Sequence, residues 1–79
     1  MLIKIILAQT TEANMLTVGK TYSTKNGKTF SCEKDIGEID TIFPFGGWLY
    51  NSDGSKDRFA YYTRGGTYKL TKSEYDLII

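Results

Sequence analysis

The pair Asn26-Gly27, set between two segments of alternating residues, limits the local fold more sharply than any other part of this sequence. Asn-Gly is the favoured pair for a type I′ turn, because both central residues of that turn need positive φ. It therefore predicts a hairpin in which residues 20–25 pair with residues 28–33. Three side chains of this hairpin can share one face: Tyr22, Phe30 and Cys32.

Further turn signals follow at short intervals and predict more strands. Residues 34–37, 51–55 and 64–66 are rich in Gly, Asp, Asn and Ser and are interpreted as turns. The segments between and after these turns are predicted to be strands: residues 38–43, a strand beginning at 48–50, residues 58–63 and residues 67–70. The chain is thus divided into strands joined by tight turns.

The two ends of the chain differ from this pattern. Residues 2–8 are nearly all apolar, as in a strand covered on both faces, and residues 9–14 predict a loop. Near the C-terminus, Thr71 and Glu74 have the spacing of a capping box, which predicts a single helical turn. A short strand at residues 77–79 is the alternative, because Leu-Ile-Ile has strand propensity. In either case we expect the last residues to pack back on the sheet.

A short motif adds a resemblance. Residues 16–22, Leu-Thr-Val-Gly-Lys-Thr-Tyr, resemble the opening of small SH3-like barrels, where a hydrophobic-x-x-Gly-Lys-x-Tyr run leads into the first barrel strand. The turn at residues 51–54, followed by an aromatic strand, and the aromatic-to-aliphatic terminus at residues 75–78 are also similar. The resemblance implies a domain of the kind found in small phage and bacterial accessory proteins, and it carries no functional residue. Residues 2–8 depart from it.

We therefore predict one mainly β domain over residues 1–79. Its architecture is expected to be a small SH3-like barrel or a strongly bent antiparallel sheet of five to six short strands. Closing the sheet would remove edge strands that otherwise promote aggregation. At most one short helical turn is expected, near the C-terminus.

The composition excludes most catalytic chemistry. The chain has no His and a single Cys, Cys32, which excludes a disulfide within the chain, a Cys/His zinc site and a Ser-His-Asp triad. Cys32 is interpreted as a small buried residue, because no base is available to activate it. The carboxylates of Asp35, Glu38 and Asp40 cluster near a turn and are interpreted as solvated turn residues. We expect no enzyme, no catalytic residue, no metal and no cofactor.

Two other patterns, a calcium-loop-like segment and two Gly-Gly pairs, lack residues that the corresponding binding motifs need. Residues 51–57 lack the bidentate Glu and the third acidic ligand of a calcium loop. Neither Gly46-Gly47 nor Gly65-Gly66 is followed by Lys-Ser/Thr, so both pairs are interpreted as tight turns rather than phosphate loops.

No apolar run approaches the roughly 18 residues of a membrane-spanning helix, so no membrane association is expected. Residues 2–8 are too short for a signal peptide and lack its basic region. A lone thiol fits a reducing compartment. The expected location is therefore the cytoplasm.

Aromatic and basic residues gather after Phe43. The chain as a whole has a formal net charge of +1, but residues 56–72 carry five basic residues against Asp57 alone, a local charge of +4. Provided that Phe59 and Tyr61 point inward, alternation places Arg58, Tyr62 and Arg64 on an outer face. The candidate binding face consists of six residues: Trp48, Tyr50, Arg58, Tyr62, Arg64 and Lys69.

These features favour a binding module over an enzyme. The first hypothesis, which draws on the resemblance, is a small phage or mobile-element accessory protein that binds and inhibits or modulates a host protein. The alternatives are a nucleic-acid or nucleotide-binding β-barrel that uses the same aromatic and basic face, and a small homo-oligomeric structural protein.

Overall fold

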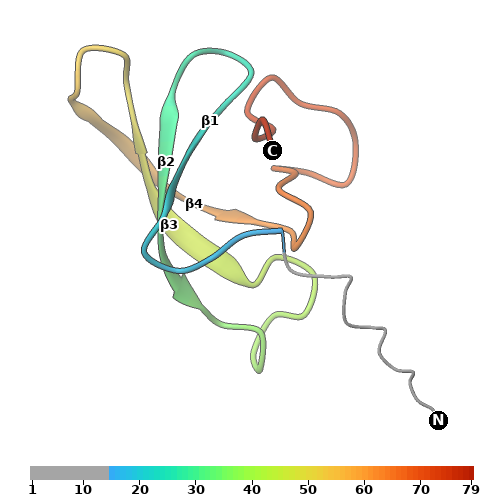
Figure 1. Cartoon of the computed structure of the whole chain (residues 1–79). Helices are drawn as coiled ribbons and strands as arrows, with labels where there is room; N and C mark the ends of the chain where they lie inside the picture. The colour runs from blue at the N-terminus through green and yellow to red at the C-terminus, as the bar shows by residue number, and fades with distance from the viewer. Residues whose placement is uncertain (1–14) are drawn as a thin grey trace, which may run out of the picture.

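The computed structural model describes residues 15–79, and these form a single antiparallel sheet (Figure 1). Its four strands lie side by side in chain order: β1 (Thr21–Ser23), β2 (Thr29–Asp35), β3 (Phe45–Tyr50) and β4 (Lys56–Tyr62). The prediction of a mainly β chain is therefore confirmed. Within this part of the chain no helix is present, and so none is long and apolar enough to cross a membrane. The predicted strand at residues 2–8 and the loop at 9–14 lie outside the described residues.

The hairpin predicted around Asn26-Gly27 joins β1 to β2, with a loop of three residues instead of two. The amide of Thr24 donates to the carbonyl oxygen of Lys28 at 2.8 Å, so these two residues face each other across the loop. The Thr24 hydroxyl oxygen also accepts the Lys28 amide at 2.8 Å. Gly27 has a φ of 89°, the left-handed conformation that closes a three-residue hairpin loop.

β3 corrects the interpretation of Gly46-Gly47 as a tight turn, because both glycines are strand residues. Gly47 lies opposite Cys32, next to an irregularity in the pairing between Cys32 and Lys34 of β2. A Cβ atom added to Gly47 would lie 1.9 Å from the carbonyl oxygen of Ser31. Glycine is therefore needed here for the close approach of two strands and not for a turn.

Residues 38–43 do not form the predicted strand. The carboxylate of Asp40 accepts hydrogen bonds from the amides of Ile42 and Phe43, both at 2.9 Å. The amide of Ile39 donates to the Ile36 carbonyl oxygen at 2.8 Å, so the chain turns at residues 36–39, just before Asp40. These local bonds use the backbone groups that a strand would offer to a neighbour.

The two turns that flank β4 are confirmed. The amide of Asn51 donates to the Ser55 carbonyl oxygen at 2.8 Å, and the amide of Thr63 to that of Thr67 at 3.0 Å. The strand predicted at residues 67–70 is absent, because the amide of Tyr68 donates instead to the carboxylate of Asp76 at 2.9 Å.

The C-terminal segment packs back on the sheet as expected, although the predicted helical turn is absent (Figure 1). The amide of Ile78 donates to the carbonyl oxygen of Ser23 in β1 at 2.8 Å, and Leu77 forms an isolated antiparallel bridge with Thr24. The amide of Leu77 donates to the carbonyl oxygen of Gly66 at 2.8 Å. The C-terminal segment therefore joins β1 to the turn that follows β4.

The core lies on one side of the sheet, under the C-terminal segment. Tyr62 and Phe30 are its centre, fully buried with ring centroids 4.4 Å apart. The predicted shared face of Tyr22, Phe30 and Cys32 is confirmed, since all three contribute to this core. The buried residues of the core are Leu16, Phe30, Cys32, Phe45, Leu49, Ala60, Tyr62 and Leu77, with Tyr22, Tyr68 and Tyr75 packed against them.

Candidate functional site

The side-chain alternation of β4 is the reverse of the predicted one. Ala60 and Tyr62 are buried, whereas Tyr61 is 38% exposed and Phe59 is half-buried on the opposite side of the sheet. Tyr62 is 0% exposed, so it cannot belong to a binding face. Its ring packs against Phe30 on the core side, and its hydroxyl donates to the Tyr75 carbonyl oxygen at 2.7 Å. The prediction that Phe59 and Tyr61 point inward is therefore wrong.

Three aromatic side chains form a row on the outer side of β3 and β4. Trp48 lies directly opposite Phe59, with ring centroids 5.6 Å apart, and Phe59 lies 5.4 Å from Tyr61, both edge to face. Tyr61 covers Gly46, where an added Cβ would lie 2.6 Å from the tyrosine ring. Trp48, Phe59 and Tyr61 are called the outer row below.

Two lysines lie over the rings of the outer row. The Lys56 Nζ is 4.4 Å from the Trp48 ring centroid, and the Lys34 Nζ is 5.2 Å from that of Phe59. Lys34 lies opposite Gly46 in the neighbouring strand β3. The sequence does not indicate Lys34 as part of this face, because Lys34 lies between the acidic residues Glu33 and Asp35.

The outer row continues into the loop between β2 and β3. Phe43 from this loop lines a shallow hollow of about 450 Å³ together with Phe59 and Tyr61, with Asp40, Ala60 and Tyr68 completing it. Two aliphatic side chains of the same loop are open to solvent, Ile39 at 86% and Ile42 at 53%. Together with the outer row, this loop gives the described chain an exposed apolar and aromatic surface.

Of the other predicted binding residues, Tyr50 lies on the same face of β3 as Trp48, two residues further along the strand, whereas Arg58, Lys69 and Arg64 lie elsewhere. Arg58 and Lys69 line a hollow on the core side of β4, together with Tyr75. Tyr50 ends β3 and is half-buried opposite Thr29 and Lys56.

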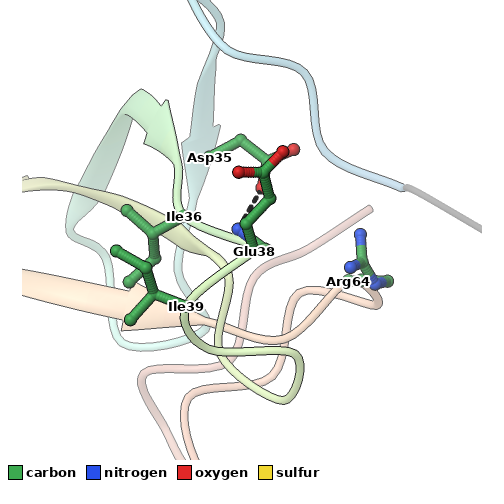
Figure 2. A pocket seen from close by; sticks show the side chains of 6 residues that line it. Asp35, Ile36, Glu38, Ile39 and Arg64 are labelled. Atoms are coloured by element: carbon green, nitrogen blue, oxygen red, sulfur yellow. Dashed lines mark hydrogen bonds between the residues drawn. The ribbon is translucent and has the colours of Figure 1, made fainter.

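Arg64 lies at a third place, beside the turn that follows β2 (Figure 2). It lines a hollow of about 550 Å³ with Asp35, Glu38 and Ile39 among others, and a Cβ on Gly37 would lie 3.1 Å from an Arg64 guanidinium nitrogen. The six predicted residues are therefore not one face. Trp48 alone among them belongs to the outer row.

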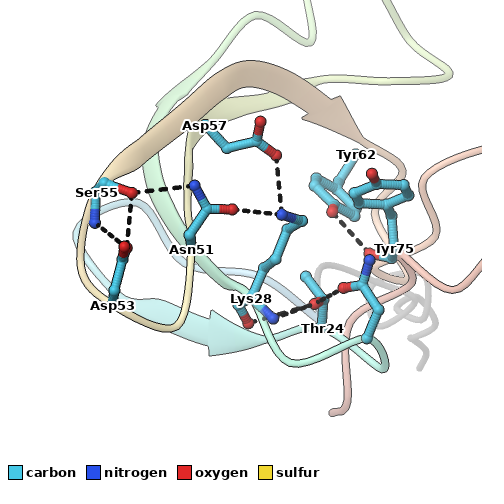
Figure 3. A network of polar contacts seen from close by, with 9 residues as sticks. Thr24, Lys28, Asn51, Asp53, Ser55, Asp57, Tyr62 and Tyr75 are labelled. Atoms are coloured by element: carbon cyan, nitrogen blue, oxygen red, sulfur yellow. Dashed lines mark hydrogen bonds and ion pairs between the residues drawn. The ribbon is translucent and has the colours of Figure 1, made fainter.

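A polar network ties the loop after β3 to the first hairpin (Figure 3). The Lys28 Nζ pairs with the Asp57 carboxylate at 3.3 Å and donates to the Asn51 side chain. Asn51 in turn donates to the Ser55 hydroxyl at 3.1 Å. Hydrogen bonds from Ser55 also lower the pKa of Asp53. The network shapes the turn and neutralises the charge of Asp57.

The ionisable groups of the core offer little reactivity. Burial raises the pKa of the Cys32 thiol, and the nearby charges of Asp35 and Glu33 raise it further. Burial also raises the pKa of Tyr62 well above that of a free phenol. Among residues 15–79, no group of three or more Cys, Asp or Glu side chains is placed to hold a metal ion.

Comparison of this chain with protein-family models, with curated proteins and with solved structures gave no match. A functional assignment therefore depends on the chemistry of the surfaces described above. Of these, the outer row and its loop are the most apolar.

Proposed function

We propose that this chain is a non-enzymatic binding module that recognises a protein partner through the outer row. The observation that carries this proposal is the position of Trp48, Phe59 and Tyr61 in a row on the side of the sheet opposite the described core, with the side chains of Lys56 and Lys34 over two of the rings. Tryptophan and tyrosine dominate the residues that supply binding energy at protein interfaces. Contiguous apolar patches at a surface mark such interfaces.

The surroundings of the outer row favour a protein over a nucleic acid. The loop that carries Phe43 also exposes Ile39 and Ile42, whose aliphatic side chains suit a protein interface and offer nothing to phosphates. The cations of Lys56 and Lys34 already lie over Trp48 and Phe59. A base that stacks on either ring would have to displace a lysine.

Single-stranded nucleic acid is the second candidate. Aromatic rings and lysines on one sheet face are the combination by which such strands are bound, through base stacking and phosphate contacts. The outer row with Lys34 and Lys56 has that combination.

The proposal extends to the finer architecture and to the origin of the chain. We infer an SH3-like barrel of five to six strands, closed by the C-terminal segment, in a small accessory protein of a phage or mobile element that inhibits or modulates a cytoplasmic host protein. Closure is supported by the hydrogen bonds that Ile78 and Leu77 make to Ser23 and Gly66, because they connect the two ends of the sheet. The phage origin and the host partner rest on the sequence resemblance.

The test uses the folded chain as bait in a bacterial lysate, followed by titration of the purified captured protein. We expect a stoichiometric partner that shifts the emission of Trp48, the one tryptophan of the chain, to shorter wavelength as water leaves the outer row. Tyr61→Ser should weaken binding by about tenfold or more. Leu70→Ser is the matched control, because Leu70 is 76% exposed and lies outside the outer row.

Three results would contradict the proposal. One is equal loss of binding in the Tyr61 and Leu70 variants. The second is no stoichiometric partner together with quenching of Trp48 by oligothymidylate, which would favour the nucleic-acid candidate. The third is concentration-dependent light scattering that Tyr61→Ser abolishes, since the outer row would then join copies of this chain.

A further inference from the structure

A basic hollow lies on the core side of the sheet, between β4 and the C-terminal segment. It is open to solvent and has a volume of about 560 Å³, which is within the usual range of small-molecule sites. It shares no residue with the outer row, although Tyr68 also lines the shallow hollow beside Phe43, Phe59 and Tyr61. The residues that line the basic hollow are Arg58, Tyr68, Lys69, Lys72, Ser73, Glu74 and Tyr75.

Arg58 is held in this hollow by two tyrosine rings. Its guanidinium carbon lies 4.5 Å from the ring centroid of Tyr75 and 5.6 Å from that of Tyr68. The two rings are themselves 5.0 Å apart, and the Tyr62 hydroxyl bonds to the Tyr75 backbone at 2.7 Å. Stacking on aromatic rings occupies the face of a guanidinium and leaves its N–H edges free to bind a planar or tetrahedral oxyanion.

Asp76 brings two lysines to the same hollow. Its carboxylate accepts hydrogen bonds from the amides of Tyr68 at 2.9 Å and Ser73 at 3.2 Å, which closes the intervening segment into a loop. Lys69 and Lys72 lie in that loop and line the hollow. Asp76 itself is 6% exposed, and both of its oxygens are engaged by the backbone.

The side chains that line the hollow carry a net positive charge. Asp57, next to Arg58 in β4, is neutralised by Lys28 at 3.3 Å (Figure 3). Within residues 15–79, no ion pair joins Arg58, Lys69 or Lys72 to a carboxylate. Glu74 is the single carboxylate among the lining residues, against three cations, so the lining carries a formal charge of +2.

We propose that the basic hollow binds the phosphate group of a small molecule, a phosphate monoester. The N–H edge of Arg58 binds two phosphate oxygens, while Lys69 and Lys72 supply point charges that balance a dianion. The hollow is larger than a phosphate ion, and the rings of Tyr68 and Tyr75 beside it are suited to the organic part of an ester.

The test is a titration of the isotope-labelled chain, followed by NMR at constant ionic strength, with inorganic phosphate in one arm and adenosine monophosphate in the other. We expect shifts of the Arg58 Nε–H and of the amides of residues 68–76, saturating with both probes. Tighter binding of the nucleotide would identify an ester as the ligand, and equal binding would identify free phosphate. Both results support the site, and neither probe should alter Trp48 emission.

Variants of the chain distinguish a specific phosphate site from non-specific electrostatic attraction of an anion. Arg58→Lys keeps the positive charge but loses the paired N–H donors of the guanidinium edge and its stacking on the tyrosine rings. It should therefore weaken binding of both probes by about tenfold or more. Lys72→Gln should weaken it by about threefold to tenfold without affecting the fold, since Lys72 is exposed. Lys20→Gln removes an exposed charge outside the hollow and is the matched control.

The proposal fails if Lys72→Gln and Lys20→Gln have equal effects, or if Arg58→Lys binds as tightly as the unaltered chain. It also fails if a thymidine oligonucleotide without a terminal phosphate shifts these amides while adenosine monophosphate does not. That result would assign the hollow to a phosphodiester backbone. A failure here leaves the proposed role of the outer row unaffected, because the cations of the basic hollow, Arg58, Lys69 and Lys72, do not belong to the outer row or to the hollow beside it.

Discussion

At the scale of single residues, Gly47 is where β2 and β3 come closest. A methyl group at this position would lie 1.9 Å from a backbone oxygen of Ser31, so Gly47→Ala requires the two strands to move apart. We expect a loss of about 3 kcal/mol in the free energy of unfolding, measured by urea denaturation. Gly65→Ala is the control, because a Cβ there meets no atom within 4 Å and it should change stability by less than about 0.5 kcal/mol. Equal effects of the two substitutions would show that the strands are not in close contact.

Tyr62 makes the stability of the fold depend on alkaline pH. In the unfolded chain its phenol loses a proton near pH 10, whereas burial raises its pKa in the folded chain. Between these two values the folded state holds one more proton, so stability is fully present below pH 10 and falls as pH rises above it. In this range the Tyr62 phenol lowers the free energy of unfolding by up to about 1.4 kcal/mol per pH unit.

The measurement is urea denaturation from pH 8 to pH 11.5 with Tyr62→Phe as the comparison. The variant should lose about 1 kcal/mol at pH 8, because the hydrogen bond to the Tyr75 carbonyl disappears. Above pH 10 its stability should fall less steeply than that of the unaltered chain. Parallel curves across the whole range would exclude Tyr62 as the source of the alkaline loss.

At the scale of elements, the sequence predicts the turns at residues 25–27 and 51–55 because their causes are local, whereas the turn predicted at Gly46-Gly47 is a strand. The hairpin at Asn26-Gly27 and the turn at residues 51–55 are formed by the residues that indicate them, through backbone and side-chain hydrogen bonds within the turn. The missed strand at residues 38–43 also has a local cause, since Asp40 bonds to two following amides. An alternating pattern is therefore weak evidence for a strand when an Asp lies inside it.

Which face of a strand is buried has a different origin and cannot be derived from alternation alone. Residues 58–62 have aromatic side chains on both faces, so period-two patterning defines the faces without showing which is buried. The choice is made by distant residues: Phe30, Tyr68 and Tyr75 contact Tyr62 on one face, and Lys34 lies over Phe59 on the other. The enrichment of aromatic and basic residues after Phe43 indicated the correct region of the chain. The pairing of strands decided which of those residues are accessible.

At the scale of the whole molecule, the C-terminal segment connects β1 with the turn that follows β4, which the sheet itself does not join. β1 and β4 are its outermost strands, and neither pairs with the other. Leu77 contacts both ends of this arrangement, through its bridge to Thr24 and its hydrogen bond to Gly66. The same segment carries Tyr75 and Lys72 into the basic hollow. Stability and the proposed phosphate site therefore depend on the docking of one segment.

Leu77→Ala tests that dependence. Leu77 is 6% exposed in the core, so the truncation should leave a cavity and reduce the free energy of unfolding by about 2–4 kcal/mol. Leu70→Ala removes the same atoms from a side chain that is 76% exposed and should cost less than about 0.5 kcal/mol. Because Ile78 bonds to Ser23, loss of docking should also speed hydrogen exchange of the β1 amides more than those of β3, which pairs on both sides. If Leu77→Ala were as mild as Leu70→Ala, or exchange rose equally in β1 and β3, docking of the C-terminal segment would not be what stabilises β1 beyond its pairing with β2.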